Sequence, residues 1–244
     1  MHSLFSQSHL IKKIELQVSD IFSDGQSSFY VLSNNILTAY NEDSEETGNR
    51  TSDSGDIITS VDVKNPFKIL VFYGHINSFR LLDRDLVPVS DEISSEDFGV
   101  FGECLLIRSD RGGYLLWDED NSELIKLNSD FEKEYTNFLR FDDPIIQLMN
   151  RKSELLFRTE KGNLFIYNTE KSELTRLVFV SNNPIFLYND QFCCFDEKLQ
   201  SFFVLQESEF GPMSLSLEFP VGSQFKNALC LNEIVVCYDE EFLY

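Results

Sequence analysis

Short apolar runs alternate with polar turns along the whole chain, and this pattern predicts β-strands. The clearest example is residues 105–127, where two apolar runs, 105–108 and 114–117, flank a turn that contains Gly112. A further stretch, 123–127, alternates apolar and polar positions, as a strand with one solvated face does. Because Gly112 can adopt the positive φ that a tight hairpin needs, we expect antiparallel strands here.

A long segment of the chain occurs twice. Residues 105–127 align without a gap on residues 155–177 at a constant offset of 50, and eight positions are identical. Conservative changes occur between them, as where Trp117 and Asp118 become Tyr167 and Asn168. A repeat of this length indicates one supersecondary unit that is stacked on copies of itself.

Fainter copies extend the repeat over the whole chain. The residues that we take as equivalent places are Tyr40, Leu82, Trp117, Tyr167, Leu205 and Tyr244. Their spacings of 42, 35, 50, 38 and 39 residues give a period near forty, which is typical of the blades of a β-propeller. We therefore predict an all-β fold in which residues 1–244 form a single propeller of about six blades. A β-sandwich and an array that does not close are the alternatives.

The last copy lacks an outer strand, and the N-terminal part of the chain can supply one. A strand within residues 9–18 would complete the C-terminal blade and close the ring. Closure of this kind hides both free edges, which would otherwise pair with other chains. We therefore expect a ring that is closed by an N-terminal strand.

Two segments interrupt the pattern. Residues 41–56 carry six acidic residues, one Arg and no large apolar residue, which predicts an acidic disordered loop over residues 41–57. This loop is either a docking or phosphorylation segment or an insertion that is tolerated between blades. Residues 128–141 predict a helical turn that connects two blades and accounts for the spacing of 50.

Two of the copies resemble WD repeats. Residues 112–118 lead from a Gly-containing turn into a strand that closes on Trp-Asp, and residues 162–168 follow the same motif with Tyr-Asn. This resemblance implies a non-catalytic platform whose faces and rims hold protein partners, often within larger assemblies. The one Gly-His pair, Gly74–His75, lies in a predicted hairpin turn, so the family's His–Asp arrangement is not assigned. A regulator-of-chromosome-condensation-like propeller is the other family considered, and its Gly-Gln-Leu-Gly signature is absent.

The chain is strongly acidic. It has 41 Asp and Glu against 20 Lys and Arg, a formal net charge of −21. Such a surface repels phosphate backbones, so we expect no direct nucleic-acid binding. The same field attracts basic protein partners, which favours a hetero-oligomer; the other interpretation is that the charge supplies solubility alone.

Known motifs of catalytic, metal and cofactor sites are absent from the sequence. The three His do not cluster, and no phosphate loop, dinucleotide motif or nucleophile elbow occurs. We therefore predict no metal, no cofactor and no enzyme activity. Cys193 and Cys194 are flanked by Phe, which predicts buried, inert thiols in a reducing compartment. Without a signal peptide or an 18-residue apolar run, we expect an intracellular protein, cytoplasmic or nuclear, with no membrane span.

These observations favour a scaffold or adaptor that binds protein partners as a subunit of an intracellular complex. One subtype is an accessory subunit of a nucleic-acid-modifying or chromatin enzyme, and another hypothesis is a purely structural part. A propeller hydrolase with carboxylates at the ring centre is the enzymatic alternative, and the apolar Phe29, Leu70, Leu105 and Leu155, taken as inner-strand positions, count against it. The residues predicted to contact a partner are Arg111, Tyr114, Trp117, Asp118, Glu42, Asp43, Glu45 and Glu46.

Overall fold

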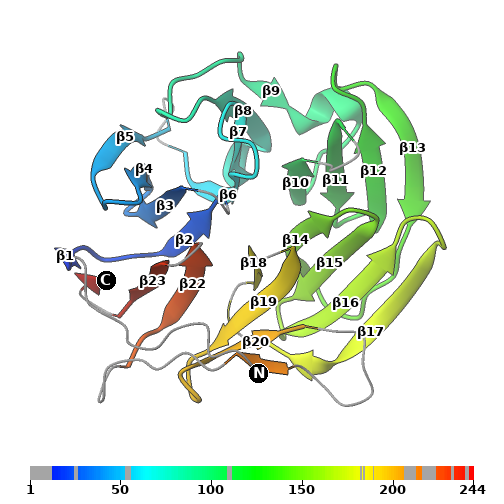
Figure 1. Ribbon diagram of the computed structural model, residues 1–244. Helices are drawn as coiled ribbons and strands as arrows, with labels where there is room; N and C mark the ends of the chain where they lie inside the picture. The colour runs from blue at the N-terminus through cyan, green and yellow to red at the C-terminus, as the bar shows by residue number, and fades with distance from the viewer. Residues whose placement is uncertain are drawn as a thin grey trace.

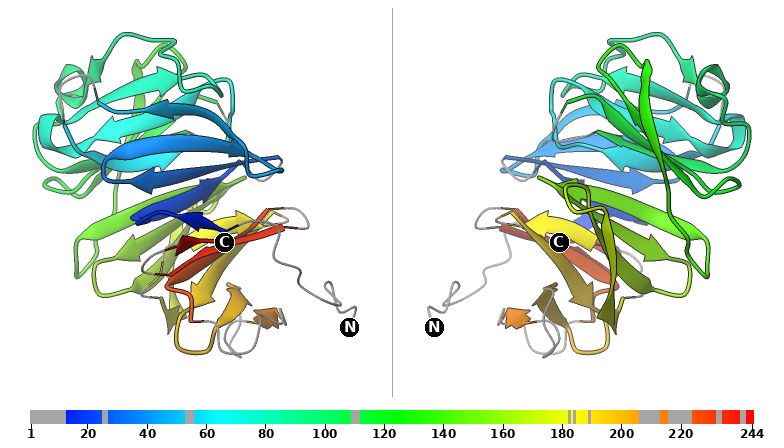
Figure 2. Two further views of the ribbon diagram at one scale, coloured as in Figure 1. Left: turned by 90° about the vertical axis from the view of Figure 1, so that its left-hand side faces the viewer. Right: turned by 90° about the vertical axis from the view of Figure 1, so that its right-hand side faces the viewer.

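A computed structural model shows six four-stranded antiparallel sheets arranged as blades around a ring (Figure 1). The residues that the structure describes are 13–24, 27–52, 56–108, 112–181, 183, 185–188, 190–205, 213–215, 224–231, 234–239 and 242–244. The predicted all-β propeller of six blades is confirmed. Views from the side show the sheets as successive layers around the ring (Figure 2).

In each blade the first strand lies at the ring centre and the later strands lie progressively outward. Blade 1 contains β2 (Asp20–Ser23), β3 (Ser28–Ser33), β4 (Ile36–Asn41) and β5 (Glu46–Arg50). Blade 2 contains β6 (Ile58–Asp62), β7 (Ile69–Tyr73), β8 (Ser78–Leu82) and β9 (Ile93–Ser94). Blade 3 contains β10 (Cys104–Arg108), β11 (Tyr114–Asp118), β12 (Glu123–Leu127) and β13 (Lys133–Phe138).

The second half of the ring repeats this plan. Blade 4 contains β14 (Ile145–Arg151), β15 (Glu154–Thr159), β16 (Asn163–Asn168) and β17 (Glu173–Val180). Blade 5 contains β18 (Ile185–Tyr188), β19 (Gln191–Asp196), β20 (Ser201–Val204) and β21 (Met213–Leu215). Blade 6 contains β22 (Asn227–Leu231), β23 (Ile234–Tyr238), β24 (Phe242–Leu243) and β1 (Ile14–Glu15). Two short 3₁₀ helices, η1 (Gly74–Ile76) and η2 (Ser95–Phe98), lie in blade 2 and after it.

The N-terminal strand closes the ring, as predicted. Ile14 pairs with Leu243 and Glu15 with Phe242, so the outer strand of blade 6 comes from the opposite end of the chain. Figures 1 and 2 show these two strands side by side. Residues 9–12 of the predicted strand lie outside the described part of the chain. Pairing satisfies the backbone groups of an edge that would otherwise be open.

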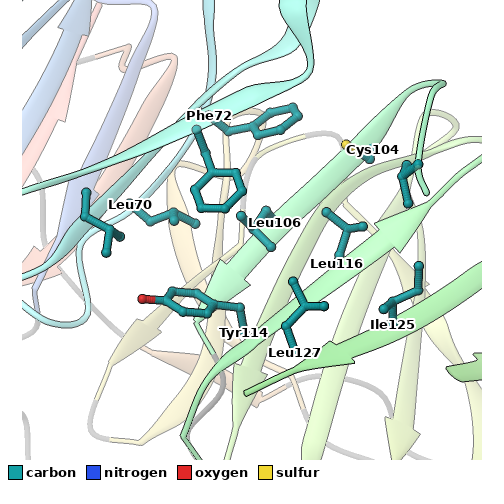
Figure 3. Packing of buried hydrophobic residues seen from close by; sticks show 11 residues of the cluster. Leu70, Phe72, Cys104, Leu106, Tyr114, Leu116, Ile125 and Leu127 are labelled. Atoms are coloured by element: carbon teal, nitrogen blue, oxygen red, sulfur yellow. The ribbon is translucent and has the colours of Figure 1, made fainter. Parts of the chain in front are cut away.

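The core consists of six apolar clusters, and each one fills the space between two neighbouring blades. Figure 3 shows the cluster between blades 2 and 3, where Leu70 and Phe72 of β7 face Leu106 of β10 and Tyr114 of β11. Every residue of β7 and β11 is buried, because these strands have a blade on both sides. This burial explains their continuous apolar runs.

The duplicated segment is displaced by one strand between the two blades. Leu105 lies on β10, the innermost strand of blade 3, whereas Leu155 lies on β15, the second strand of blade 4. Trp117 therefore ends a second strand, and the expectation that it marks the same place as Tyr167 is wrong. Leu127, which ends the third strand of blade 3, is the residue equivalent to Tyr167. When Leu127 replaces Trp117 as the marker, its spacing from Leu82 is 45 residues instead of 35, and its spacing to Tyr167 is 40 instead of 50.

The structure places outer strands where a loop and a helical turn were expected. β5 lies within the predicted acidic loop. β13 lies within residues 128–141, so the prediction of a helical turn there is wrong. One turn type precedes both strands. The Asn41 side-chain oxygen accepts from the backbone N–H of Glu45 at 2.8 Å, and Asn128 accepts from Glu132 at the same distance. Such Asn turns reverse the chain locally and so lead into an antiparallel strand.

Connections leave the ring on two faces, which we name by the direction of the innermost strands. The entry face is the face at which each innermost strand begins, and the exit face is the one at which it ends. On the entry face, polar side chains bind the beginning of the next blade; we call these contacts inter-blade staples. Asn35 accepts from the N–H of Ile58 at 2.7 Å, and Gln200 exchanges two hydrogen bonds of 2.9 Å with the backbone of Phe225.

Candidate partner-binding face and central channel

Exposed apolar side chains gather on the entry face. Of the thirteen large apolar residues that are exposed in the described part of the chain, eight lie in its connections or at the strand ends beside them. They are Ile36, Ile57, Ile76, Phe101, Phe138, Ile146, Val180 and Leu199. We call this set the apolar ring. Its members come from five blades and the connections between them, and Phe101 and Phe138 are 73% and 74% exposed.

Among the described residues, the exit face has fewer exposed large apolar side chains, and they are confined to one blade. Phe67, Val87 and Val89 all belong to connections of blade 2. The remaining two exposed apolar residues, Tyr135 and Val178, lie on the fourth strands of blades 3 and 4. Because most of the exposed large apolar residues of the described chain lie on the entry face, this face is the better candidate for a contact surface.

The apolar ring is interspersed with acidic residues. The described entry-face connections carry Asp56, Glu96, Asp97, Glu103, Glu119, Asp120, Asp142, Asp143, Glu160, Glu197 and Asp239. Their basic residues are Arg140, Lys161, Lys198 and Lys226, and Lys161 forms an ion pair with Asp143. The side chain of Glu119 is an inter-blade staple, since it accepts from the N–H of Ile145 at 3.0 Å. This face therefore combines apolar anchors with a negative field.

Three of the predicted contact residues are buried instead. Tyr114, Trp117 and Asp118 are 3%, 1% and 2% exposed. The Trp117 indole packs edge-on against two Phe rings, and its N–H donates to Glu119 at 2.6 Å. Asp118 accepts from the N–H of Asn121 at 3.2 Å, which is the turn role that its position suggested. These side chains serve packing and turn formation, and Arg111 lies outside the described residues.

The four predicted acidic residues lie together but on the other face. Glu42, Asp43, Glu45 and Glu46 are exposed around the turn between β4 and β5, which belongs to the exit face. Asn41 donates to the carboxylate of Glu45 at 3.1 Å. The structure therefore does not bring this cluster together with the end of β11, where Trp117 lies. The apolar ring was missed because its members are single residues in separate connections.

A cavity of about 400 Å³ lies at the ring centre, and we call it the channel. It is lined by residues from five innermost strands, β2, β6, β10, β14 and β18, and by the segments that follow them. Its charged lining residues are Asp20, Asp24, Asp62, Lys64, Arg158 and Asp190. The apolar positions used as evidence against a hydrolase were therefore mostly misplaced. Phe29, Leu70 and Leu155 lie on second strands, and only Leu105 lies on an innermost strand.

Asp20 begins β2 near the entry face and faces the channel. Its carboxylate accepts from the N–H of Ile21 at 2.8 Å. Burial raises the pKa of the Asp20 carboxyl to about 6, while the hydrogen bond from Ile21 and the charge of Arg158 act in the opposite direction. A carboxyl group with this pKa is partly protonated close to neutral pH.

Arg158 reaches the same channel from β15, on the opposite side of the ring. A β-bulge lies between Ile145 and Gln147 at the beginning of β14. A bulge of this kind re-aims the side chain beside it. Gln147 accepts from the Nε of Arg158 at 3.0 Å and from the N–H of Ile185 at 2.8 Å, and it donates to the carbonyl of Ile185 at 2.8 Å. It thus fixes the guanidinium and joins blades 4 and 5.

The far end of the channel is held by a different contact. Lys64, which follows β6, donates to the side-chain oxygen of Asn150 at 2.8 Å and also to its backbone carbonyl. Asn150 lies on β14, so this contact links blade 2 directly to blade 4, although blade 3 stands between them in the ring. Asp62 accepts from the N–H of Lys64 at 3.0 Å. The channel therefore has polar groups at both ends and mainly apolar walls between them.

The described thiols are buried, as predicted for a core position. Burial raises the pKa of Cys104, Cys193, Cys194 and Cys237 to about 12 each, so they are protonated at neutral pH. Within the described ranges, no group of three or more potential metal ligands occurs. The same part of the chain contains no helix with the length and hydropathy that a bilayer crossing requires.

Comparisons with known proteins identify the fold. No family model matches the chain, and no curated protein matches its sequence. Solved propellers match its structure. Virginiamycin B lyase from Staphylococcus aureus superposes with a TM-score of 0.54 and 11% identity, over 93% of this chain and 88% of that chain. The Pan2 WD40 domain of Neurospora crassa gives 0.54 and 13%, over 80% and 64%. The shared feature is the β-propeller.

A third match extends this result. Hsv2 of Kluyveromyces lactis, with one loop replaced by a linker, gives a TM-score of 0.52 and 10% identity, over 91% of this chain and 75% of that chain. Since identities near 10% show the fold alone, the likeness to WD repeats holds at the level of the fold. The lyase and the WD40 domain share it with this chain, so the fold does not determine the function.

Proposed function

We propose that this chain is a non-catalytic adaptor that binds a basic, amphipathic segment of a protein partner on its entry face, within an intracellular complex. The observation that carries the proposal is the apolar ring, whose eight exposed side chains extend over five blades. Interfaces are centred on apolar anchors with a polar rim, and the entry face has this composition. WD repeats, which two blades resemble, imply the same kind of role.

Charge specifies the chemistry of the partner. The described entry-face connections carry eleven acidic residues against four basic ones, and the whole chain has a net charge of −21. A partner with apolar side chains for the ring and Lys or Arg for the surrounding carboxylates would complement both features. An accessory subunit of a nucleic-acid-modifying or chromatin enzyme fits this description, because the partner would supply the basic surface. A nuclear or cytoplasmic location accords with it.

Site-specific cross-linking in cells tests the proposal. A photoreactive amino acid replaces Phe101 on the entry face, and the matched control replaces Phe67 on the exit face; the two side chains are 73% and 71% exposed. We expect one dominant cross-linked protein from position 101, with a basic segment at the site of attachment. A partner captured equally from position 67, or an acidic segment at the attachment site, would contradict the proposal.

A hydrolase that acts at the ring centre is the second candidate. It is favoured by the raised pKa of the Asp20 carboxyl group, which lines the channel. Glycoside hydrolysis by a pair of carboxyl groups requires one of them to be protonated. Turnover of a glycoside panel by the purified chain, abolished in the Asp20→Asn variant, would favour this candidate over the adaptor.

A further inference from the structure

The central channel presents two opposite charges from opposite sides of the ring. Asp20 belongs to blade 1 and Arg158 to blade 4, which are three blades apart in a ring of six. Both line the same channel of about 400 Å³. Each charge also shifts the pKa of the other group, so they lie within electrostatic reach. The ring therefore holds an anionic and a cationic group around one small space.

Both groups are held in place before any ligand arrives. The backbone N–H of Ile21 binds one carboxylate oxygen of Asp20. Gln147 binds the Nε of Arg158, and the backbone of Ile185 in turn holds Gln147. Fixing polar groups in this way reduces the conformational entropy that binding would otherwise cost.

The walls between these groups are mainly apolar. Ile21, Ile107, Leu148 and Leu187 are among the residues that line the channel. Its volume falls within the range of small-molecule sites, which combine apolar walls with a few fixed polar groups. A cation alone would meet Arg158, and an anion alone would meet Asp20. A molecule that carries both charges would meet a partner for each.

We propose that the channel binds a small zwitterion with an apolar body, either a free apolar amino acid or a short apolar peptide, with its ammonium at Asp20 and its carboxylate at Arg158. Charge-assisted hydrogen bonds of this kind are the strong ones, and the apolar body would lie against the aliphatic wall. The site is separate from the apolar ring and does not depend on the proposed adaptor function.

Calorimetric titration of the full chain tests this proposal with four probes. L-leucine and the dipeptide Leu-Leu are the zwitterions, and N-acetyl-leucine and leucine amide lack one charge each. We expect a zwitterion to bind and the loss of either charge to weaken binding by about tenfold or more. Preference for leucine or for Leu-Leu distinguishes a free amino acid from a peptide. Binding by neither zwitterion, or equal binding by a blocked probe, would overturn the proposal.

Two variants locate the site. Asp20→Asn keeps the acceptor for Ile21 but removes the charge, so it should lose about tenfold or more in affinity for the preferred zwitterion. Asp130→Asn changes an exposed carboxylate in the turn before β13, outside the channel, and should leave the affinity unchanged. If both variants bind as the wild type does, or both lose binding, the assignment to Asp20 is wrong.

Carbon NMR of the Asp20 carboxyl group, recorded as a function of pH with and without the ligand, gives a second measurement that does not depend on affinity. A bound ammonium favours the ionised carboxylate, so the midpoint of the titration should move below its ligand-free value. The other charged groups that line the channel are Asp24, Asp62, Lys64, Arg158 and Asp190, and the measurement follows the Asp20 signal alone. A midpoint that does not move on saturation would contradict the proposed pose. Cross-linking from the entry face would be unaffected by that result.

Discussion

The turns between third and fourth strands differ from the connections that carry inter-blade staples. On the exit face, turns such as the one between β4 and β5 are closed by their own residues, as where Asn41 binds Glu45. On the entry face, side chains such as Asn35 and Glu119 reach into the next blade. The turn between β4 and β5 is therefore local, whereas these entry connections join neighbouring blades. Contacts between blades also occur on the exit face, where Lys64 binds Asn150 and Arg151 donates to the carbonyl of Asp190 at 3.1 Å. A surface made of joined blades is suited to hold a partner at several fixed points.

The same contrast separates side chains that hold the ring from side chains that a partner can reach. Trp117 and Phe138 both lie at entry-face strand ends in blade 3, yet they are 1% and 74% exposed. The structural role and the proposed binding role thus belong to neighbouring residues of one blade. The experiments that follow are arranged to separate these roles.

The largest expected effect is the loss of the Trp117 side chain. Trp117→Ala removes a ring packed between blades 3 and 4 and leaves a cavity, so the free energy of unfolding should fall by about 3 to 5 kcal/mol. Phe138→Ala is the matched control and should change stability by less than about 0.5 kcal/mol. Urea unfolding followed by circular dichroism measures both. Equal losses would remove the distinction between buried and exposed residues of this face.

The next effect compares a staple with a local turn. Glu119→Ala removes the acceptor of both Trp117 Nε1 and the N–H of Ile145, so we expect a loss of about 3 kcal/mol in the free energy of unfolding. Asn41→Ala, in the exit turn, should cost only about 1 kcal/mol because its partner Glu45 is exposed to water. A larger loss for Asn41→Ala would mean that the exit turns, too, hold the ring together.

A smaller effect depends on pH and comes from the channel. Because burial raises the folded-state pKa of Asp20 from 3.8 to about 6, the native state binds more protons between these values than the unfolded state does. The Asp20 contribution to stability is then fully present below pH 4 and declines as the pH rises through 6. Asp20→Asn should therefore be more stable than the wild type at pH 7, by about 2 kcal/mol, with little difference at pH 4. Thermal unfolding at both pH values measures this, and a variant that is less stable at pH 7 would contradict it.

The smallest effect on stability accompanies the proposed loss of binding. Phe101→Asp places a charge at a side chain that is 73% exposed, so the unfolding free energy should change by less than about 0.5 kcal/mol. Co-purification of the partner with the chain should nevertheless be lost. Phe67→Asp on the exit face should affect neither quantity. If Phe101→Asp keeps the partner at wild-type levels, the apolar ring is not the contact surface.

Much of the fold could be predicted from local patterns. The apolar runs of β7 and β11 and the forty-residue period follow directly from strands that are buried on both sides. The N-terminal closure followed from a blade with a missing outer strand. β13 could not be predicted in this way, because an outer strand has a neighbour on one side only and all six of its residues are polar or exposed. The Asn41 and Asn128 turns were the sequence signal that would have found β5 and β13.

The candidate sites were beyond the reach of sequence patterns. Asp20 and Arg158 are far apart in the chain and line one channel only because the ring closes. The members of the apolar ring are single residues in separate connections, and a single exposed apolar residue is common on any surface. The sequence repeat aligns strands that differ by one place in their blades. It therefore indicated Leu155 as an inner-strand residue, although Leu155 lies on a second strand and Ile145 begins the innermost strand of that blade.

Amide hydrogen exchange of the chain, alone and with its co-purified partner, tests the adaptor role most directly. We predict slower exchange in the entry-face connections, residues 74–77, 95–103 and 139–144, when the partner is present. Exchange in the exit turns, residues 42–45 and 128–132, should remain unchanged. Protection of the exit turns with no change at the entry-face connections would contradict the account.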